Sequence, residues 1–321
     1  MTAARLLTVG EAMLRLTPTL QLPFIENSQL DVSVGGAELN VAVAARCMGL
    51  EASWMSRLPR GILSEKITRH ARSNGVDPVI SYGEGRVGIY FAEVAVDPRG
   101  VTVTYDRDYS AAQSMGRAEF ASLIDVNHFT AVFSSGITLA LGESPRELVT
   151  SLFEQKHSWR RYFEINYRSK LATTSDMKLW VSDILPNVDV LFASTHDLTE
   201  LLELGDDLQT AVQKAISTYQ LEYVVVADRR GKVDGVGINT VRVFGENLDA
   251  FHEFQGRVVD PIGAGDAGAG VFVACIEQGL APDQAAQYAV IASAWTQTHA
   301  GDAATFQRSD LIDLDDRRIR R

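Results

Sequence analysis

One short segment near the C-terminal end constrains the fold of this chain more than any other. It reads Asp260-Pro261-Ile262-Gly263-Ala264-Gly265-Asp266, and the apolar run Val271–Ile276 follows it closely. Glycines before an apolar run predict a tight turn that opens a helix, with Asp266 in the first turn. Free N–H groups and the positive end of the helix dipole stabilise an anion at such a place. The segment therefore predicts an anion site with a carboxylate beside it.

Asp266 is the candidate catalytic group of this segment. A carboxylate beside an anion site can accept the proton of a substrate hydroxyl as that hydroxyl attacks a γ-phosphate. The residues Gly263, Ala264 and Gly265 would form the backbone around the transferred phosphoryl group, with amides directed at it. A turn that packs a helix against a sheet, with Asp266 as an ordinary first-turn carboxylate, explains the same letters equally well.

The dinucleotide-binding pattern G-x-G-x-x-G also matches this segment, and it matches a second one, Gly83–Gly88. The pattern predicts a dinucleotide site only between a strand and a helix, usually in the first βαβ unit. Gly83–Gly88 precedes the strand-like Ile89-Tyr90-Phe91, and the match at Gly263 comes late in the chain. An NAD-dependent dehydrogenase is therefore the weakest alternative.

Composition narrows the class of protein and its partners. The chain has 321 residues, 46% of them hydrophobic, and 30 Lys and Arg against 41 Asp and Glu, a formal net charge of −11. These values predict a globular protein with a large core, either one big α/β domain or one with an appended smaller sheet. So acidic a surface repels phosphate backbones, so nucleic acid is not an expected partner. An anionic substrate must then be captured by a local cluster of Arg or Lys.

Two features predict a cytoplasmic protein. Cys47 and Cys275 each lie in a helix-like apolar stretch, which predicts two buried, inert thiols in a reducing compartment. No segment approaches 18 uninterrupted apolar residues, and the first residues do not resemble a signal peptide. No membrane span is therefore expected.

An alternation of strand-like and helix-like segments predicts an α/β fold with a mostly parallel sheet covered by helices on both faces. Ligands bind such sheets beyond the carboxyl ends of the strands. The predicted strands are 131–135, 162–165, 188–192 and 223–227, and the predicted helices between them are 145–156, 177–185 and 207–219. A hairpin, with strands at 87–96 and 101–105, is expected to leave this sheet.

Three further clusters carry polar groups in other parts of the chain. They are Gly35-Gly36-Ala37-Glu38-Leu39-Asn40, then Tyr90 with Tyr105-Asp106-Arg107, and then Asn166-Tyr167-Arg168. Taken singly, they read as a helix start, strand aromatics and a surface loop.

Together with the Gly263–Asp266 loop, these clusters resemble the ribokinase-like (PfkB) carbohydrate kinases, and within that family the 2-keto-3-deoxygluconate kinases. The resemblance covers nearly the whole chain. It extends through Gly10-Glu11, Ser56-Arg57-Leu58-Pro59, Ser135-Gly136-Ile137-Thr138 and Gly301-Asp302. The loop is typical of the family at large, and the other clusters point to the ketodeoxy-acid branch.

The resemblance implies a single ribokinase-like α/β domain over 1–321, with a small β-sheet lid formed by about 12–34 and 85–108. In the family this lid often packs against the lid of a second subunit in a dimer. It implies ATP with Mg²⁺ as donor, with metal ligands left unassigned. The implied substrate-binding residues are Gly36, Asn40, Tyr90, Tyr105, Arg107, Arg168 and Asp302. The implied nucleotide-binding residues are Asn166, Asp228, Gly231, Gly263 and Gly265.

The chain departs from the family pattern on the nucleotide side. Pro261 stands where Thr is usual, Gly268 stands where Phe is usual, and Ser194-Thr195-His196-Asp197 replaces Asn-x-x-Glu. The turn expected to border the nucleotide phosphates reads Ala227-Asp228-Arg229-Arg230-Gly231, with an acidic residue and a shifted glycine.

We therefore expect an ATP-dependent kinase for the primary hydroxyl of 2-keto-3-deoxygluconate or a close relative, with Asp266 as base. Arg107 and Arg168 favour an acidic substrate, because a guanidinium pairs with a carboxylate through two hydrogen bonds. A fructokinase-like enzyme for a neutral ketose is the alternative within the class. A sugar-acid sensor that has lost nucleotide binding is the alternative from another class.

Overall fold

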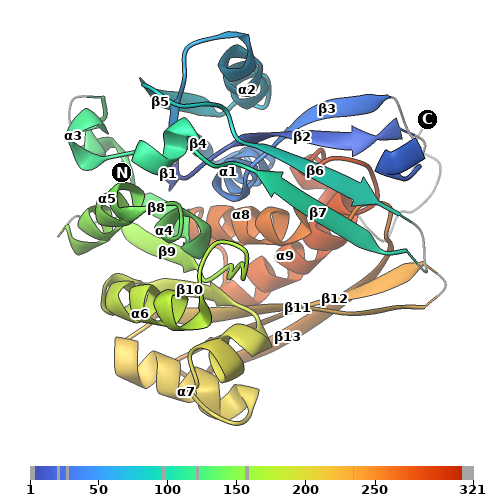
Figure 1. Ribbon diagram of the computed structural model, residues 1–321. Helices are drawn as coiled ribbons and strands as arrows, with labels where there is room; N and C mark the ends of the chain where they lie inside the picture. The colour runs from blue at the N-terminus through green and yellow to red at the C-terminus, as the bar shows by residue number, and fades with distance from the viewer. Residues whose placement is uncertain are drawn as a thin grey trace.

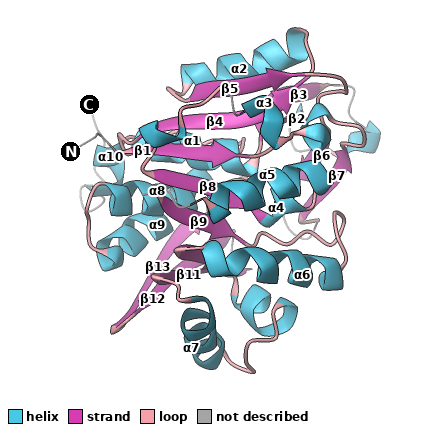
Figure 2. Ribbon diagram, turned by 90° about the vertical axis from the view of Figure 1, so that its left-hand side faces the viewer, coloured by secondary structure: helices cyan, strands magenta, loops and turns pink. Residues whose placement is uncertain are grey.

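The computed structural model describes residues 4–19, 22–26, 29–95, 99–120, 123–155, 159–233 and 235–312. A nine-stranded sheet forms its centre, in the order β13-β12-β11-β10-β9-β8-β1-β4-β5 (Figures 1 and 2). In this order, neighbouring strands from β11 to β5 run parallel to each other. The strand β12 runs antiparallel to both of its neighbours, β11 and β13. The strands are β1 (Arg5–Val9), β4 (Glu51–Leu58), β5 (Asp77–Tyr82), β8 (Ala131–Ser135), β9 (Arg160–Glu164), β10 (Val190–Ala193), β11 (Tyr223–Val233), β12 (Val236–Gly245) and β13 (Leu248–Arg257). The predicted α/β class and its mostly parallel sheet are confirmed.

Helices cover both faces of this sheet because its strands present apolar side chains on both faces. One core layer lies between the sheet and α1, α8 and α9, and the other between the sheet and α5, α6 and α7 (Figure 2). The helices are α1 (Ala37–Cys47), α2 (Ile62–Ser73), α3 (Arg117–Phe120), α4 (Gly136–Leu139), α5 (Glu143–Glu154), α6 (Thr174–Ile184), α7 (Leu208–Tyr219), α8 (Ala264–Glu277), α9 (Pro282–Thr296) and α10 (Arg308–Ile312).

A separate four-stranded sheet, which we call the lid, lies over the amino end of α8 (Figure 1). Its order is β3-β2-β6-β7, formed by β2 (Met13–Pro18), β3 (Leu30–Gly35), β6 (Ile89–Val94) and β7 (Val101–Asp106). The predicted hairpin is β6–β7, and its turn includes residues 96–98, outside the described residues. The outer side chains of Leu30 and Val32 are exposed, and assembly through this face stays a prediction.

Two expectations about local structure were wrong. The turn predicted at Ala227–Gly231 is absent, because β11 continues to Val233 and pairs with β12 along its length. Cys275 is buried as expected, but Cys47 is partly exposed at the end of α1. Burial nevertheless raises the pKa of the Cys47 thiol to about 11, which keeps it protonated and unreactive at neutral pH. None of the helices described is both long and apolar enough to cross a membrane.

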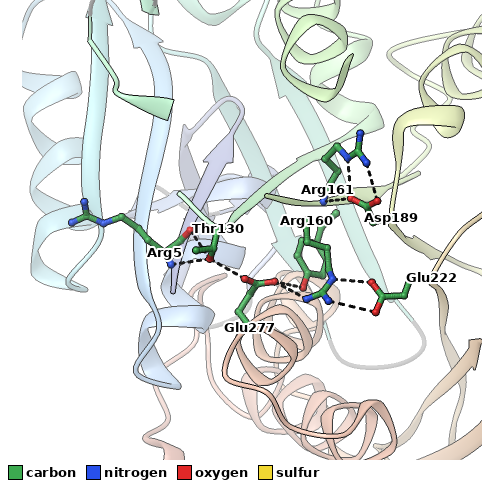
Figure 3. Close-up of polar contacts among 8 residues, drawn as sticks. Arg5, Thr130, Arg160, Arg161, Asp189, Glu222 and Glu277 are labelled. Carbon is green, nitrogen blue, oxygen red and sulfur yellow. Dashed lines mark hydrogen bonds and ion pairs between the residues drawn. The ribbon is translucent and has the colours of Figure 1, made fainter. Parts of the chain in front are cut away.

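A polar cluster at the amino ends of the strands anchors the far end of α8. Glu277 is the last residue of α8, and Figure 3 shows its carboxylate between Thr130 and Arg160. The Arg160 guanidinium also bonds Glu222. Glu277 accepts hydrogen bonds of 2.9 Å from Thr130 Oγ1, 3.0 Å from Arg160 Nη1 and 2.8 Å from the Tyr162 hydroxyl. Three donors on one buried carboxylate tie α8 to β8 and β9.

Glu277→Ala should destabilise the protein, because it leaves the buried Tyr162 hydroxyl without an acceptor and removes the partly buried ion pair with Arg160. We expect a loss of about 2–4 kcal/mol in the free energy of unfolding. Glu222→Ala removes only the exposed partner of Arg160 and should cost below about 1 kcal/mol. Urea unfolding of both variants checks this, and equal losses would show that the cluster does not anchor α8.

Candidate active site

The loop before α8 has the predicted geometry of an anion site. Gly263 caps the helix with φ 82°, a left-handed conformation that favours glycine, and Ala267 N–H donates to its carbonyl. A Cβ at Gly263 would overlap the carbonyl oxygen of Asp302, so no other residue fits there. The amides that begin α8 therefore face the cavity in front of it.

Asp266 lies in the first turn of α8, at the floor of that cavity. Asn40, in the first turns of α1, donates a 2.7 Å hydrogen bond from Nδ2 to Asp266 Oδ2. Removal from bulk water raises the pKa of Asp266 to about 7. A base with a pKa near the working pH transfers protons efficiently.

A cavity of about 600 Å³ between the lid and α8 brings the predicted substrate-binding residues together. Residues of the lid, such as Tyr90, and of the nine-stranded sheet, such as Glu164, both line it. The predicted residues that line it are Gly36, Asn40, Tyr90, Tyr105, Arg107, Asn166, Arg168, Gly263, Gly265, Asp266 and Asp302. Ala264 is buried and is not part of this lining. We call this space the acceptor cavity.

Arg107 does not present a free charge to this cavity. Its guanidinium forms an ion pair with Glu11, and both side chains are buried. By contrast, Arg168 is exposed to the cavity, and no carboxylate of the described residues lies within ion-pair distance of it. The structure thus favours Arg168 over Arg107 as the residue available to an anionic substrate.

The Asp302 carboxylate is likewise already paired within the protein. The buried Arg15 of β2 pairs with Asp302 Oδ1 at 2.6 Å and with Asp260, and the Tyr90 hydroxyl donates to Asp302. Asp260 also accepts the backbone N–H groups of Ile262 and Gly301, each at 3.1 Å. Sequence reasoning missed Arg15 and Asp260, because nothing local marks partners separated by about 245 residues.

A second cavity of about 290 Å³ lies behind the loop, between α8, α9 and the carboxyl ends of β10 and β11, and we call it the inner cavity. Gly268, which stands where Phe is usual in the family, lines this cavity. The wall also contains Ser194 and Asp197, whose carboxylate accepts hydrogen bonds from Ser194 N–H and Oγ at 2.8 and 2.7 Å.

Asp228 and Gly231 line neither cavity, although both were expected to contact the nucleotide. The Asp228 carboxylate accepts hydrogen bonds from the Thr195 N–H and hydroxyl, at 3.2 and 2.5 Å. The strand conformation of β11 explains this position, because successive side chains point to opposite faces. The Asp228 carboxylate thus faces Thr195 and lines neither cavity.

Glu164, at the carboxyl end of β9, is a site residue that sequence reasoning missed. It lines both cavities, together with Asn166, Arg168 and Gly265. Its Oε2 atom has no hydrogen-bond partner in the described part of the chain. Burial first, and then the charge of Asp266, raises the pKa of Glu164 to about 8. The sequence signal that could have indicated Glu164 as a site residue is its position, two residues before the predicted nucleotide-binding residue Asn166.

Comparison with known proteins assigns this geometry to a family. Residues 3–308 match the model of the pfkB family carbohydrate kinases, so the chain belongs to this family and is a carbohydrate kinase. It is 34% identical over 304 residues to the 2-dehydro-3-deoxygalactonokinase of Haloferax volcanii, covering 94% of this chain and 93% of that one.

Two further relatives carry a related name. The 2-dehydro-3-deoxygluconokinase of Thermoproteus tenax is 30% identical over 303 residues, covering 92% of this chain and 89% of its own. The crystal structure of 2-dehydro-3-deoxygluconokinase from Thermotoga maritima superposes with a TM-score of 0.91 at 27% identity, covering 97% and 98% of the two chains. The fold is ribokinase-like, as the resemblance implied.

Glu164→Gln should change how stability depends on pH. Because the folded protein raises the pKa of Glu164, its protonated form favours folding, and this contribution is lost as pH rises through the folded pKa of about 8. The variant should therefore gain at least about 1 kcal/mol relative to wild type between pH 5 and pH 9. Urea unfolding at both pH values measures it, with the exposed Glu154→Gln as control. An identical pH dependence in wild type and Glu164→Gln would contradict the prediction.

Proposed function

We propose that this kinase phosphorylates the primary hydroxyl of 2-keto-3-deoxygluconate or a close relative such as 2-keto-3-deoxygalactonate, with ATP and Mg²⁺ as donor. The observation that carries the proposal is the meeting of Asp266, the amino end of α8 and an unpaired Arg168 in one cavity under the lid. The names of the relatives support this substrate class.

In this proposal Asp266 is the general base. Its carboxylate accepts the proton of the substrate hydroxyl as the new P–O bond forms, and the amides at the start of α8 stabilise the charge of the transferred phosphoryl group. Asn40 holds the Asp266 carboxylate in place. The lid excludes water, which would otherwise compete as acceptor.

Arg168 binds the carboxylate of the sugar acid in this proposal. No carboxylate of the described residues lies within ion-pair distance of it, whereas the buried Arg107 is already paired with Glu11. Lys170 adds a second positive charge to the same cavity, and its ammonium donates a 2.9 Å hydrogen bond to the Val103 carbonyl of the lid. A neutral ketose would leave this charge uncompensated.

Among the described residues that line the two cavities, Glu164 has a carboxylate that fits a Mg²⁺ ion. Its unpartnered Oε2 lies where the two cavities meet, and Mg²⁺ prefers carboxylate and phosphate oxygens. A cation there would reduce the charge repulsion between the phosphates and the acidic side chains.

Asp266→Asn should preserve shape and remove the base. Because general-base catalysis contributes typically about 10²–10⁴-fold, kcat should fall by about that factor while the Kd of the sugar acid changes little. Asp283→Asn, an exposed first-turn carboxylate of α9, is the matched control. An ADP-release assay with calorimetry measures both quantities. The assignment is refuted if Asp266→Asn retains more than about a tenth of wild-type kcat.

Arg168→Ala should discriminate between acidic and neutral substrates. Loss of a charge-assisted hydrogen bond to the carboxylate should cost about 1.5–3 kcal/mol in kcat/KM for 2-keto-3-deoxygluconate and much less for fructose. Arg107→Ala should reduce kcat/KM for both substrates, because it leaves the buried Glu11 unpaired.

Equal losses for the two substrates in Arg168→Ala would show that Arg168 does not bind the carboxylate. ADP release over a panel of sugars and sugar acids separates the alternatives. Faster turnover of fructose favours the fructokinase-like enzyme, and sugar-acid binding without turnover favours the sensor.

A further inference from the structure

A buried arginine of the lid lies behind the acceptor cavity without lining it. Arg15 of β2 is only 1% exposed, so its guanidinium meets no ligand directly. The guanidinium pairs with Asp302, which lines the cavity, and with Asp260, which lines neither cavity. Its Nε atom donates a 2.9 Å hydrogen bond to Thr17 Oγ1 of the same strand. The guanidinium is thus held by β2, by the loop before α8 and by the loop after α9.

Both oxygens of the Asp302 carboxylate face partners inside the protein. Arg15 Nη1 donates to Oδ1 at 2.6 Å, and the Tyr90 hydroxyl donates to Oδ2. All three side chains are buried, so water does not compete for these hydrogen bonds, and the low local dielectric strengthens them. We call Arg15, Asp302 and Tyr90 the buried triad. Asp302 is its central member and links Arg15 to Tyr90.

Gly35, the last residue of β3, leaves the space that the buried triad needs. It lies opposite Met13 of β2, in the part of the lid next to the cavity. A Cβ at this position would overlap both the Tyr90 hydroxyl and the Asp302 carboxylate. The lid strand β3 is therefore shaped around the hydrogen bond between Tyr90 and Asp302.

The buried triad decides which hydrogen bond Tyr90 offers to a ligand. A phenol oxygen carries one proton and also has lone pairs that accept. Burial, and then the charge of Asp302, raises the pKa of Tyr90 above its ordinary range, so the proton stays on the phenol. That proton is donated to Asp302, and the oxygen is left as an acceptor. A hydroxyl group of a ligand can donate to it, whereas a carboxylate, which only accepts, cannot.

We propose that Arg15 is a positioning residue that sets the orientation of the sugar acid in the acceptor cavity. Acting through Asp302, it holds the Tyr90 proton away from the cavity. Tyr90 then accepts a hydrogen bond from a substrate hydroxyl, and the substrate carboxylate is left to Arg168. The proposal rests on the proposed function, since it divides that cavity into a side for a hydroxyl and a side for the carboxylate.

Three variants separate this role from a merely structural one. Arg15→Lys keeps the buried positive charge, which favours folding, but loses the planar set of donors that reaches two carboxylates at once. Tyr90→Phe removes only the hydroxyl at the end of the triad and leaves the ion pairs of Arg15 in place. Arg86→Lys is the matched control, because the exposed Arg86, just before β6, also donates twice to one carboxylate, that of Asp106, at 2.7 and 2.9 Å. Arg86 lines neither cavity.

Binding is measured by titration calorimetry with 2-keto-3-deoxygluconate and with analogues in which either secondary hydroxyl is replaced by fluorine, which cannot donate a hydrogen bond. In wild type, one of these analogues should bind about 3- to 10-fold more weakly than the parent sugar acid, the range of one neutral hydrogen bond. This discrimination should disappear in Tyr90→Phe. It should fall to below about twofold in Arg15→Lys, because the Tyr90 proton is then free to turn toward the fluorine. Arg86→Lys should discriminate as wild type does.

Three results would overturn the proposal. The first is equal binding of the parent and of both analogues by wild type, which would show that Tyr90 does not accept from the substrate. The second is full discrimination in Tyr90→Phe. The third is an equal loss for parent and analogue in Arg15→Lys, with the discrimination kept, which is what a purely structural arginine produces.

Failure of the proposed function looks different from failure of this inference. If the protein binds the sugar acid but releases no ADP with it, the kinase assignment falls, and the calorimetric comparison still decides the role of Arg15. If wild type binds no sugar acid at all, both proposals fall together.

Discussion

The geometry of the site depends on the buried ion pairs of Arg15. This lid residue pairs with Asp260, before α8, and with Asp302, after α9. Asp260 also holds the backbone of Ile262 and Gly301, so one guanidinium joins the lid to both loops around the anion site. Two buried carboxylates without this cation would repel each other and any phosphate nearby. The position of the lid and the shape of the anion site are therefore coupled.

The remaining charges show what the site leaves for its ligands. Asp260, Asp302 and Glu11 are paired with Arg15 or Arg107, and Asp266 accepts a hydrogen bond from Asn40. By contrast, Glu164 Oε2 has no partner in the described part of the chain. Arg168 and Arg229 line the acceptor cavity, and no carboxylate of the described residues lies within ion-pair distance of either. The cavity therefore presents positive charge to an anionic ligand, although the chain has a formal net charge of −11.

The sequence predicted local features well and distant partners poorly. The helix start at Gly263, the position of Asp266 and the alternation of strands and helices are short-range signals, and the structure agrees with them. The partner of Arg107 could not be predicted, because Glu11 lies 96 residues away and only the fold brings the two together. The continuation of β11 past Ala227 was missed because Gly231 suggested a turn, whereas pairing with β12 absorbs it as a bulge.

The loop after β9 joins the acceptor cavity to the lid. Asn166 adopts a left-handed conformation with φ 42°, one that Asn tolerates better than most residues, as the chain leaves the sheet. The same loop carries Arg168 into the acceptor cavity and lets Lys170 donate to the Val103 carbonyl of β7. In the proposed function, a carboxylate bound at Arg168 would contact the same short loop that is hydrogen-bonded to the lid through Lys170. Substrate binding and exclusion of water would then depend on one segment.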